Sequence, residues 1–320
     1  MHVHNFFPAL SPSVYDACAD EHVPVVQTLH NYRLMCANGL LFRQGGICTE
    51  CLGHKIPWPS VQHGCYRGSR LGSFTVASMI AFHRWRRTWI DRVQRFIALT
   101  DFARDIFVKE MDIPYERVVV KPNAVGDVGI GDHGGGYALY VGRLSPEKGV
   151  EVLLKAATSG EGFGIPLKIA GSGPLANAVR AASLAGQAKQ SVEFLGSVDR
   201  KAVYRLMQQA RVLLMPSLWY EGLPMVIPEA FATGLPVIAS RIGALAALID
   251  DGRNGLLANP GDERDLARIV RLLVSNSAVE VELRRGARET YLTRYHPTQN
   301  TGHLLEIYGQ LAQWNNQARV

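Results

Sequence analysis

The second half of the chain alternates short apolar runs with longer amphipathic segments. Continuous apolar runs bounded by turns are typical of strands buried on both faces of a parallel sheet. Segments of helical periodicity separate these runs, so the pattern predicts a regular series of strand–helix units. The predicted strands, one of which runs into a glycine turn, occupy residues 137–144, 167–174, 192–198, 212–217 and 235–240.

The first half shows the same rhythm less regularly, with predicted strands near residues 25–29 and 117–125. It begins inside a unit, without the strand and glycine-rich turn that usually open a doubly wound domain. We therefore expect a truncated Rossmann-like domain over residues 1–126 and a polar, cysteine-rich insertion at residues 36–70. The remaining predicted parts are a glycine-rich linker at 127–136, a second Rossmann-like domain at 137–296 and a final helix at 297–320 that crosses back to the first domain.

A basic, aromatic segment over residues 78–96 is predicted to form an amphipathic helix that runs into a strand. Its aromatic and arginine side chains recur at three- and four-residue spacing on different faces. The commoner interpretation is a helix packed on the core with a solvated arginine face. The other is a peripheral contact with an anionic membrane, because tryptophan and arginine favour that interface.

Composition excludes some classes of protein. Apolar residues make up 47% of the 320 residues and the formal net charge is +6, which suits a globular protein with anionic ligands. No zinc-finger, RNA-recognition or helix-turn-helix pattern occurs, so we expect no nucleic-acid partner. No apolar run is long enough to span a bilayer, and the start has no signal-peptide pattern. We therefore expect a cytoplasmic protein, with peripheral attachment to the inner face of the membrane as the second interpretation above.

Four of the five cysteines lie in the insertion, where thiolates are the usual ligands of structural zinc. The inner two form a C-x2-C pair, and the outer two lie about a dozen residues to either side. The sequence leaves open a structural zinc site and a long loop with four reduced thiols. The candidate ligands are Cys36, Cys48, Cys51 and Cys65, with His54 and His63 in reserve.

The stretch EGLPMVIPEAFATG contains two glutamates, Glu221 and Glu229, eight positions apart. It lies between two predicted parallel strands, so its loop falls at the carboxyl end of a strand, where open α/β sheets bind ligands. Carboxylates accept hydrogen bonds from sugar hydroxyls, and a helix N-terminus attracts phosphate. The pair therefore indicates a ligand with phosphate and hydroxyl groups, although Glu229 would also be favourable in any first helical turn.

A second motif, GRLSPEKG, also joins a predicted strand to a helix. Arg143 at the strand end can bind phosphate oxygens in a bidentate fork, and Lys148 adds a mobile point charge. The alternative is a surface loop in which both cations pair with Glu147. The spacing differs from a P-loop, and no G-x-G-x-x-G follows a strand, so a dinucleotide-dependent oxidoreductase lacks its fingerprint.

These motifs occur in the order GRLSPEKG, AGSGP, FLGSV, MPS, EGLPMVIPEA and GLPVIAS. Together they resemble the donor-binding half of the family 4 retaining glycosyltransferases of GT-B fold. The early segments HVHNFFPALSPSVYDAC, VVQTLHNYRLMC and CTEC resemble a bacterial branch that builds exopolysaccharide, capsule or lipid-linked glycans. The resemblance covers nearly the whole chain and implies two Rossmann-like domains facing a cleft, the first of them incomplete.

The resemblance assigns four residues to catalysis. Glu221 matches the first acid of the E-x7-E element, which faces the hydroxyls of the donor sugar near the anomeric carbon. Arg143 and Lys148 match the pair that stabilises the diphosphate leaving group. His30 matches a histidine of the first domain that approaches the donor sugar.

The resemblance assigns four further residues to donor binding. Glu229 matches the second acid of the element, which holds the ribose, and Val198 matches the position beside the base. The amides around Gly222 and Leu223 would assist at the diphosphate.

By this resemblance the protein would transfer a sugar from a UDP- or GDP-type donor to a glycan or lipid-linked acceptor, with retention of anomeric configuration. No D-x-D pair lies at a suitable loop, so no cofactor is expected for catalysis. The missing opening strands favour an alternative, an inactive nucleotide-sugar-binding remnant or partner subunit. The matching acids and cations favour an enzyme.

Overall fold

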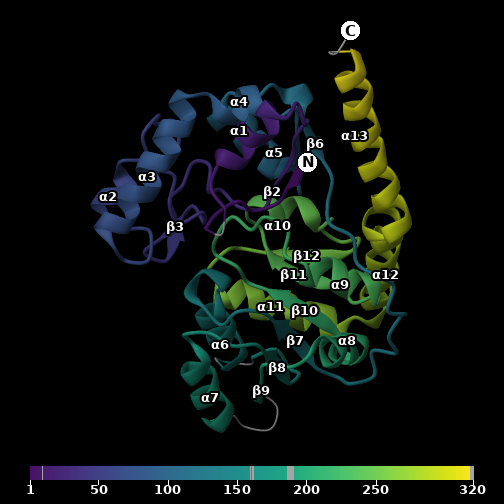
Figure 1. Cartoon of the computed structure of the whole chain (residues 1–320). Helices are drawn as coiled ribbons and strands as arrows, with labels where there is room; N and C mark the ends of the chain where they lie inside the picture. The colour runs from purple at the N-terminus through teal and green to yellow at the C-terminus, as the bar shows by residue number, and fades with distance from the viewer. Residues whose placement is uncertain (9, 159, 161, 186–190, 318–320) are drawn as a thin grey trace. The chain divides into compact units, whose positions relative to one another are not determined.

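The computed structural model describes residues 1–8, 10–158, 160, 162–185 and 191–317, with side chains of the last helix described through residue 312 (Figure 1). The chain forms two compact units. The first contains Met1–Asn123 and Asn300–Val320, and the second contains Ala124–Gln299. Each has its own parallel sheet.

The second unit is built on a six-stranded parallel sheet of order β12-β11-β10-β7-β8-β9. This is the doubly wound order of a Rossmann fold, with the topological switch between the adjacent strands β7 and β10. The strands are short, and all except the edge strand β9 are almost fully buried, as the apolar runs predict. Their bounds are β7 Ala138–Val141, β8 Leu167–Ala170, β9 Val192–Gly196, β10 Val212–Met215, β11 Val237–Ser240 and β12 Gly255–Ala258.

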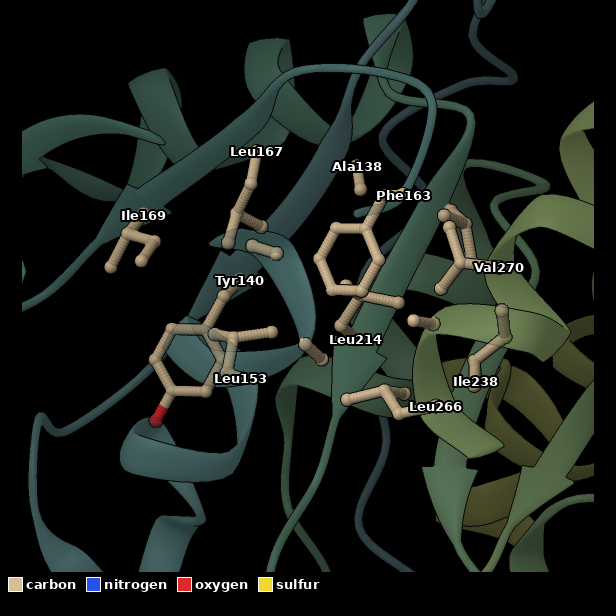
Figure 2. Packing of buried hydrophobic residues seen from close by; sticks show 14 of the residues in the cluster. Ala138, Tyr140, Leu153, Phe163, Leu167, Ile169, Leu214, Ile238, Leu266 and Val270 are labelled. Atoms are coloured by element: carbon tan, nitrogen blue, oxygen red, sulfur yellow. The ribbon is translucent and has the colours of Figure 1, made fainter. Parts of the chain in front are cut away.

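Helices cover both faces of this sheet. Those on one face, α6, α7 and α11, bury Leu153, Leu266 and Val270 against Tyr140 and Leu214 of the central strands (Figure 2). Helices α8 and α9 lie on the other side (Figure 1). The helices and helical turns of the unit are η2 Pro146–Lys148, α6 Val150–Thr158, α7 Ala176–Ala185, α8 Arg200–Gln209, α9 Val226–Ala232, α10 Gly243–Leu248, α11 Glu263–Ser275, α12 Ser277–Thr290 and the π-helical η3 Tyr291–Tyr295.

The glycine-rich segment that composition assigns to a linker is held against the second unit. The N–H of Gly131 donates to the carbonyl of Thr233, and a Cβ at Gly131 would lie 2.0 Å from the carbonyl oxygen of Gln208. His133 is buried between the carbonyls of Ala210 and Thr233. Glycine is therefore used here for close backbone approach as well as for turning the chain.

The first unit has a four-stranded parallel sheet of order β1-β2-β5-β6, formed by His2–Val3, Val26–Leu29, Arg95–Ala98 and Val118–Val120. Helix α13, Pro297–Gln317, packs on this sheet, burying Ile307 and Leu311 against Val26 and Ile97. The other elements of the unit are α1 Ser13–Asp20, the hairpin of β3 Phe42–Arg43 and β4 Gly46–Ile47, α2 Pro59–Gln62, α3 Arg70–Trp85, α4 Thr88–Arg92, α5 Asp101–Met111 and η1 Tyr115–Arg117.

The prediction of one helix over residues 78–96 is wrong. Helix α3 ends at Trp85, Arg87 adopts a left-handed conformation (φ 53°), and α4 begins a separate turn at Thr88. The buried hydroxyl of Thr88 lies 2.9 Å from Nδ1 of His83, which fixes the break. The predicted aromatic stripe is divided accordingly, because Trp89 is buried while Trp85 is 77% exposed.

Candidate active site

The loops after β7 and β10 meet at the topological switch of the second unit. The N–H of Leu218, after β10, donates to the carbonyl of Glu147, after β7, at 2.9 Å. Gly149 has φ +69°, and a Cβ there would lie 1.8 Å from the carbonyl oxygen of Pro216. Only glycine permits this approach without a backbone shift, so the two predicted motifs form one site at the carboxyl edge of the sheet.

Glu221 and Lys148 form a buried ion pair at this site. Lys148 Nζ lies 2.7 Å from Oε1 and 2.9 Å from Oε2 of Glu221, and Ser217 Oγ donates to Oε1 at 2.7 Å. Glu221 is only 3% exposed. A carboxylate at such depth is stable only when it is paired and hydrogen-bonded, as it is here.

Trp219 covers the ion pair from the loop after β10. Lys148 Nζ lies 5.3 Å from the centroid of its ring, within the range of a cation–π contact. The indole Nε1 is buried and, among the described residues, has no hydrogen-bond partner. An unsatisfied donor beside a charged pair is available to a ligand hydroxyl or phosphate oxygen.

Arg143 lies on the other side of the β7 loop, beside a hollow of about 310 Å³. Its guanidinium is 67% exposed and reaches Glu147 Oε1 only at 4.0 Å. The hollow lies at the carboxyl ends of β7, β8 and β9, and Val198 forms part of its wall. Gly171 lets the backbones after β7 and β8 approach closely beside it, since a Cβ there would lie 1.9 Å from the carbonyl oxygen of Gly142. Arg143 and Val198 thus line one anion-accessible space.

Glu229 has different partners from Glu221. It lies in α9 and is bonded from α8, with Arg200 Nη2 at 3.3 Å and the Tyr204 hydroxyl at 3.4 Å from its Oε1. Burial raises the pKa of Glu229, and the nearby Arg200 partly opposes this. The carboxylate can therefore exchange one of these long contacts for a ligand hydroxyl.

Gly222 and Leu223 connect Glu221 to the start of α9 at Val226. Within the residues that the structure describes, their N–H groups donate to no protein acceptor. These two amides are available as donors to a ligand, and their contact with a diphosphate stays a prediction.

His30 lies in the first unit, at the end of β2, and belongs to a cluster of histidines. His30 Nε2 is 2.8 Å from His4 Nδ1, and the His4 ring stacks on His2 at a centroid distance of 4.3 Å. His2 also contacts Thr28 at 2.7 Å and Tyr308 of α13 at 2.6 Å. Burial, followed by the neighbouring His4, lowers the pKa of both His30 and His2, that of His2 to about 4. His2 and His30 are therefore neutral at pH 7.

The four cysteines of the insertion are free thiols, with Cys36 and Cys51 buried and Cys48 and Cys65 half-buried. They lie close enough to interact, since burial and then the nearby Cys36 thiol raise the pKa of Cys51 to about 12. Among the described residues, however, no three His, Cys, Asp or Glu side chains are arranged to hold a metal ion. The zinc site therefore stays a prediction.

The site contains residues that the sequence analysis missed. Ser217 and Trp219 contact the ion pair directly, and Arg200 and Tyr204 bond Glu229. Ser217 had a signal, because a small polar residue directly follows a buried strand. The pair on α8 had none beyond an i, i+4 spacing that many surface helices share.

Known proteins are similar in sequence to this chain. A chain from Erwinia amylovora, the amylovoran biosynthesis glycosyltransferase AmsK, is 30% identical over 54% of this chain and 44% of its own length. The phosphatidyl-myo-inositol mannosyltransferase of Mycobacterium leprae is 28% identical over 73% of this chain and 64% of its own length. The chain thus spans about half the length of these relatives.

Solved structures share the fold. Anabaena HepE in complex with UDP has a TM-score of 0.71 and 17% identity, over 97% of this chain and 78% of its own. The sucrose-phosphate synthase of Thermosynechococcus elongatus has a TM-score of 0.68 and 18% identity, over 98% and 73%. At this identity the likeness shows the fold, two Rossmann-like units of the GT-B class.

The family model described as "Glycosyl transferases group 1" matches residues 131–290, half of the 320-residue chain. This range contains both motifs and every residue of the site in the second unit. The protein therefore belongs to the group 1 glycosyltransferases.

Proposed function

We propose that this protein transfers a sugar from a nucleoside-diphosphate sugar to a glycan or lipid-linked acceptor, with retention of anomeric configuration. The observation that carries the proposal is the pair of Lys148 and the buried Glu221 at the switch point, with the exposed Arg143 on the other side of the same β7 loop. A cation for phosphate and a carboxylate for sugar hydroxyls lie together where a Rossmann sheet binds its ligand.

In this proposal the diphosphate of the donor binds to the side chains of Lys148 and Arg143. The C–O bond between the anomeric carbon and the β-phosphate breaks, and negative charge grows on the departing phosphate. Lys148 Nζ, the exposed Arg143 guanidinium and the free amides of Gly222 and Leu223 are donors for that charge. Glu221 keeps one oxygen on Ser217 and accepts from sugar hydroxyls as Lys148 turns to the phosphate.

Retention follows if the acceptor attacks from the face that the diphosphate leaves. Glu221 is buried and bonded by Ser217 as well as by Lys148, so this carboxylate is better suited to orienting the sugar than to forming a covalent intermediate. The neutral His30 would accept a hydrogen bond from the donor sugar or donate one to it. Glu229 would hold the ribose hydroxyls, with Val198 beside the base.

Relatives and neighbours suggest the donor and the location. HepE was solved with UDP and with UDP-glucose, which favours a uridine donor over GDP for this chain. The AmsK relative acts in amylovoran biosynthesis, in line with an exopolysaccharide product. No helix of the described residues is long and apolar enough to cross a membrane. We propose a cytoplasmic enzyme that reaches its acceptor by peripheral contact with the inner face of the membrane.

The first test is the melting temperature of the purified chain with saturating UDP, GDP or ADP. A ligand at about 100 times its dissociation constant adds about 2.7 kcal/mol to the folded state, which is a shift of a few degrees. We expect UDP alone to produce it. Absence of a shift with all three would contradict nucleotide binding.

A second test separates an enzyme from an inactive binding protein. Glu221→Gln keeps the shape and the contact with Ser217 but removes the charge, so we expect loss of transfer with UDP binding changed only a few-fold. Arg143→Ala should instead weaken UDP binding itself. Transfer by Glu221→Gln at the wild-type rate would overturn the assignment, and UDP binding without transfer by any form of the chain would favour the inactive remnant.

A further inference from the structure

Helix α3 of the first unit exposes an apolar face to solvent. Leu71 and Trp85 are each 77% exposed, and Phe74 and Phe82 about half exposed. Their successive spacings of three, eight and three positions put them on one side of the helix. The opposite side, with Val76 and Ile80, is buried. A large apolar stripe left uncovered on a folded domain is typical of an interaction surface.

The segment around this helix is basic. Residues 51–90 contain six Lys and Arg and no Asp or Glu, which equals the net charge of +6 of the whole chain. Arg67 and Arg70 lie at the start of α3, and among the described residues neither has an ion-pair partner. The apolar face thus has unpaired positive charge beside it.

Acidic side chains from neighbouring elements meet the other end of α3. Arg86 pairs with Asp16 of α1 and Arg87 with Asp91 of α4. A groove of about 840 Å³ beside Phe82 and Trp85 is lined by Lys55 and Arg84 as well as by Glu110 and Asp112. Positive charge free to meet an anion is therefore concentrated near Arg67 and Arg70.

We propose that this face of α3, Leu71, Phe74, Phe82 and Trp85 with Arg67 and Arg70, docks the protein on an anionic lipid bilayer. The apolar side chains enter the interface while the arginines meet lipid phosphates. A bilayer fits better than a protein groove because the stripe extends over the whole helix and mixes aromatic side chains with unpaired arginines. The inference rests on the proposed function, because it names the surface for the membrane contact proposed there. Vesicle binding needs no sugar transfer, so an experiment can contradict the docking surface or the transferase activity separately.

The test is co-sedimentation of the full chain with vesicles of phosphatidylcholine alone or mixed with phosphatidylglycerol. We expect binding to the anionic vesicles and little to the neutral ones. Leu71→Ser with Trp85→Ser should weaken binding at least about tenfold, since both side chains leave water on insertion. Arg67→Gln with Arg70→Gln should weaken binding to anionic vesicles about tenfold.

The matched control replaces Leu184 and Leu272, exposed leucines on α7 and α11 of the second unit, by serine. Binding should not change, and all variants should melt as the wild type does because the altered side chains are exposed. A blue shift of tryptophan emission on vesicle addition should vanish in Trp85→Phe. No vesicle binding by the wild type would overturn the proposal. Concentration-dependent dimers that the Leu71/Trp85 variant abolishes would also overturn it, because they would assign the face to contact with a second copy of the chain.

Discussion

Two regions of the molecule place charged and apolar side chains in opposite ways. One is the carboxyl edge of the sheet in the second unit, and the other is the loop-and-helix segment 31–87 of the first unit. At the sheet edge, the Glu221 carboxylate is buried and has partners in Lys148 and Ser217. In the segment of the first unit, large apolar side chains such as Leu71 and Trp85 are instead exposed to solvent. Burying a charge and exposing a large apolar side chain both reduce the free energy of unfolding, so each region marks a surface that serves a ligand or a partner.

The largest expected difference between the two regions is in the free energy of unfolding when one glycine in each is replaced by alanine. Gly149→Ala places a Cβ 1.8 Å from the carbonyl oxygen of Pro216 at a residue with φ +69°. We expect a loss of about 4 kcal/mol in the free energy of unfolding, from backbone strain and overlap together. Gly46→Ala in β4 meets nothing within 4 Å and should change it little. Urea unfolding of both variants measures this, and similar values would contradict the close approach of the β7 and β10 loops.

The next difference concerns charge. Lys148→Met leaves the Glu221 carboxylate, which is 3% exposed, without its cation, and should cost about 3 kcal/mol in the free energy of unfolding. Arg70→Met removes an exposed cation of α3 and should cost almost nothing. Adding Glu221→Gln to Lys148→Met should recover much of the loss. Additive effects of the two substitutions in a double-mutant cycle would show that the ion pair contributes nothing.

Acid should weaken the first unit through its histidine cluster. The pKa of His2 is lowered to about 4 from an ordinary value near 6.5 because the ring is buried beside His4. The unfolded chain then binds more protons than the folded one between these values, so stability falls as pH decreases from about 6.5 to 4. Melting temperatures over this range should fall less steeply for His2→Gln. An unchanged slope would mean that His2 titrates normally.

The smallest effects are expected at the cysteines. Cys48 and Cys65 are half-buried and Cys36 and Cys51 buried, so a thiol reagent should modify the first two faster in the folded, metal-free chain. Metal analysis of the purified protein tests the predicted zinc site in the same samples. One zinc per chain that protects all four thiols until a chelator is added would support the site and require the segment to rearrange. Absence of zinc would end that prediction.

The sequence by itself determined where the chemistry of the second unit gathers. Arg143, Lys148, Glu221 and Val198 each follow a recognisable parallel strand, and the carboxyl ends of such strands share one edge of the sheet. Short-range order along the chain was therefore enough to predict their place. The same motifs indicated the family of the chain, and the range that the family model matches contains all four residues.

Only the tertiary structure decided which groups touch and which stay exposed. Three contacts could not be predicted from the positions of the residues in the sequence. They are the hydrogen bond from Ser217 to Glu221, the bond from Arg200 of α8 to Glu229 and the stacking of His2 on His4. The helix predicted over 78–96 breaks at Arg87, which leaves Trp85 outside and Trp89 inside. Periodicity specifies that a helix has an apolar face, but burial depends on whether an element from elsewhere in the chain covers that face.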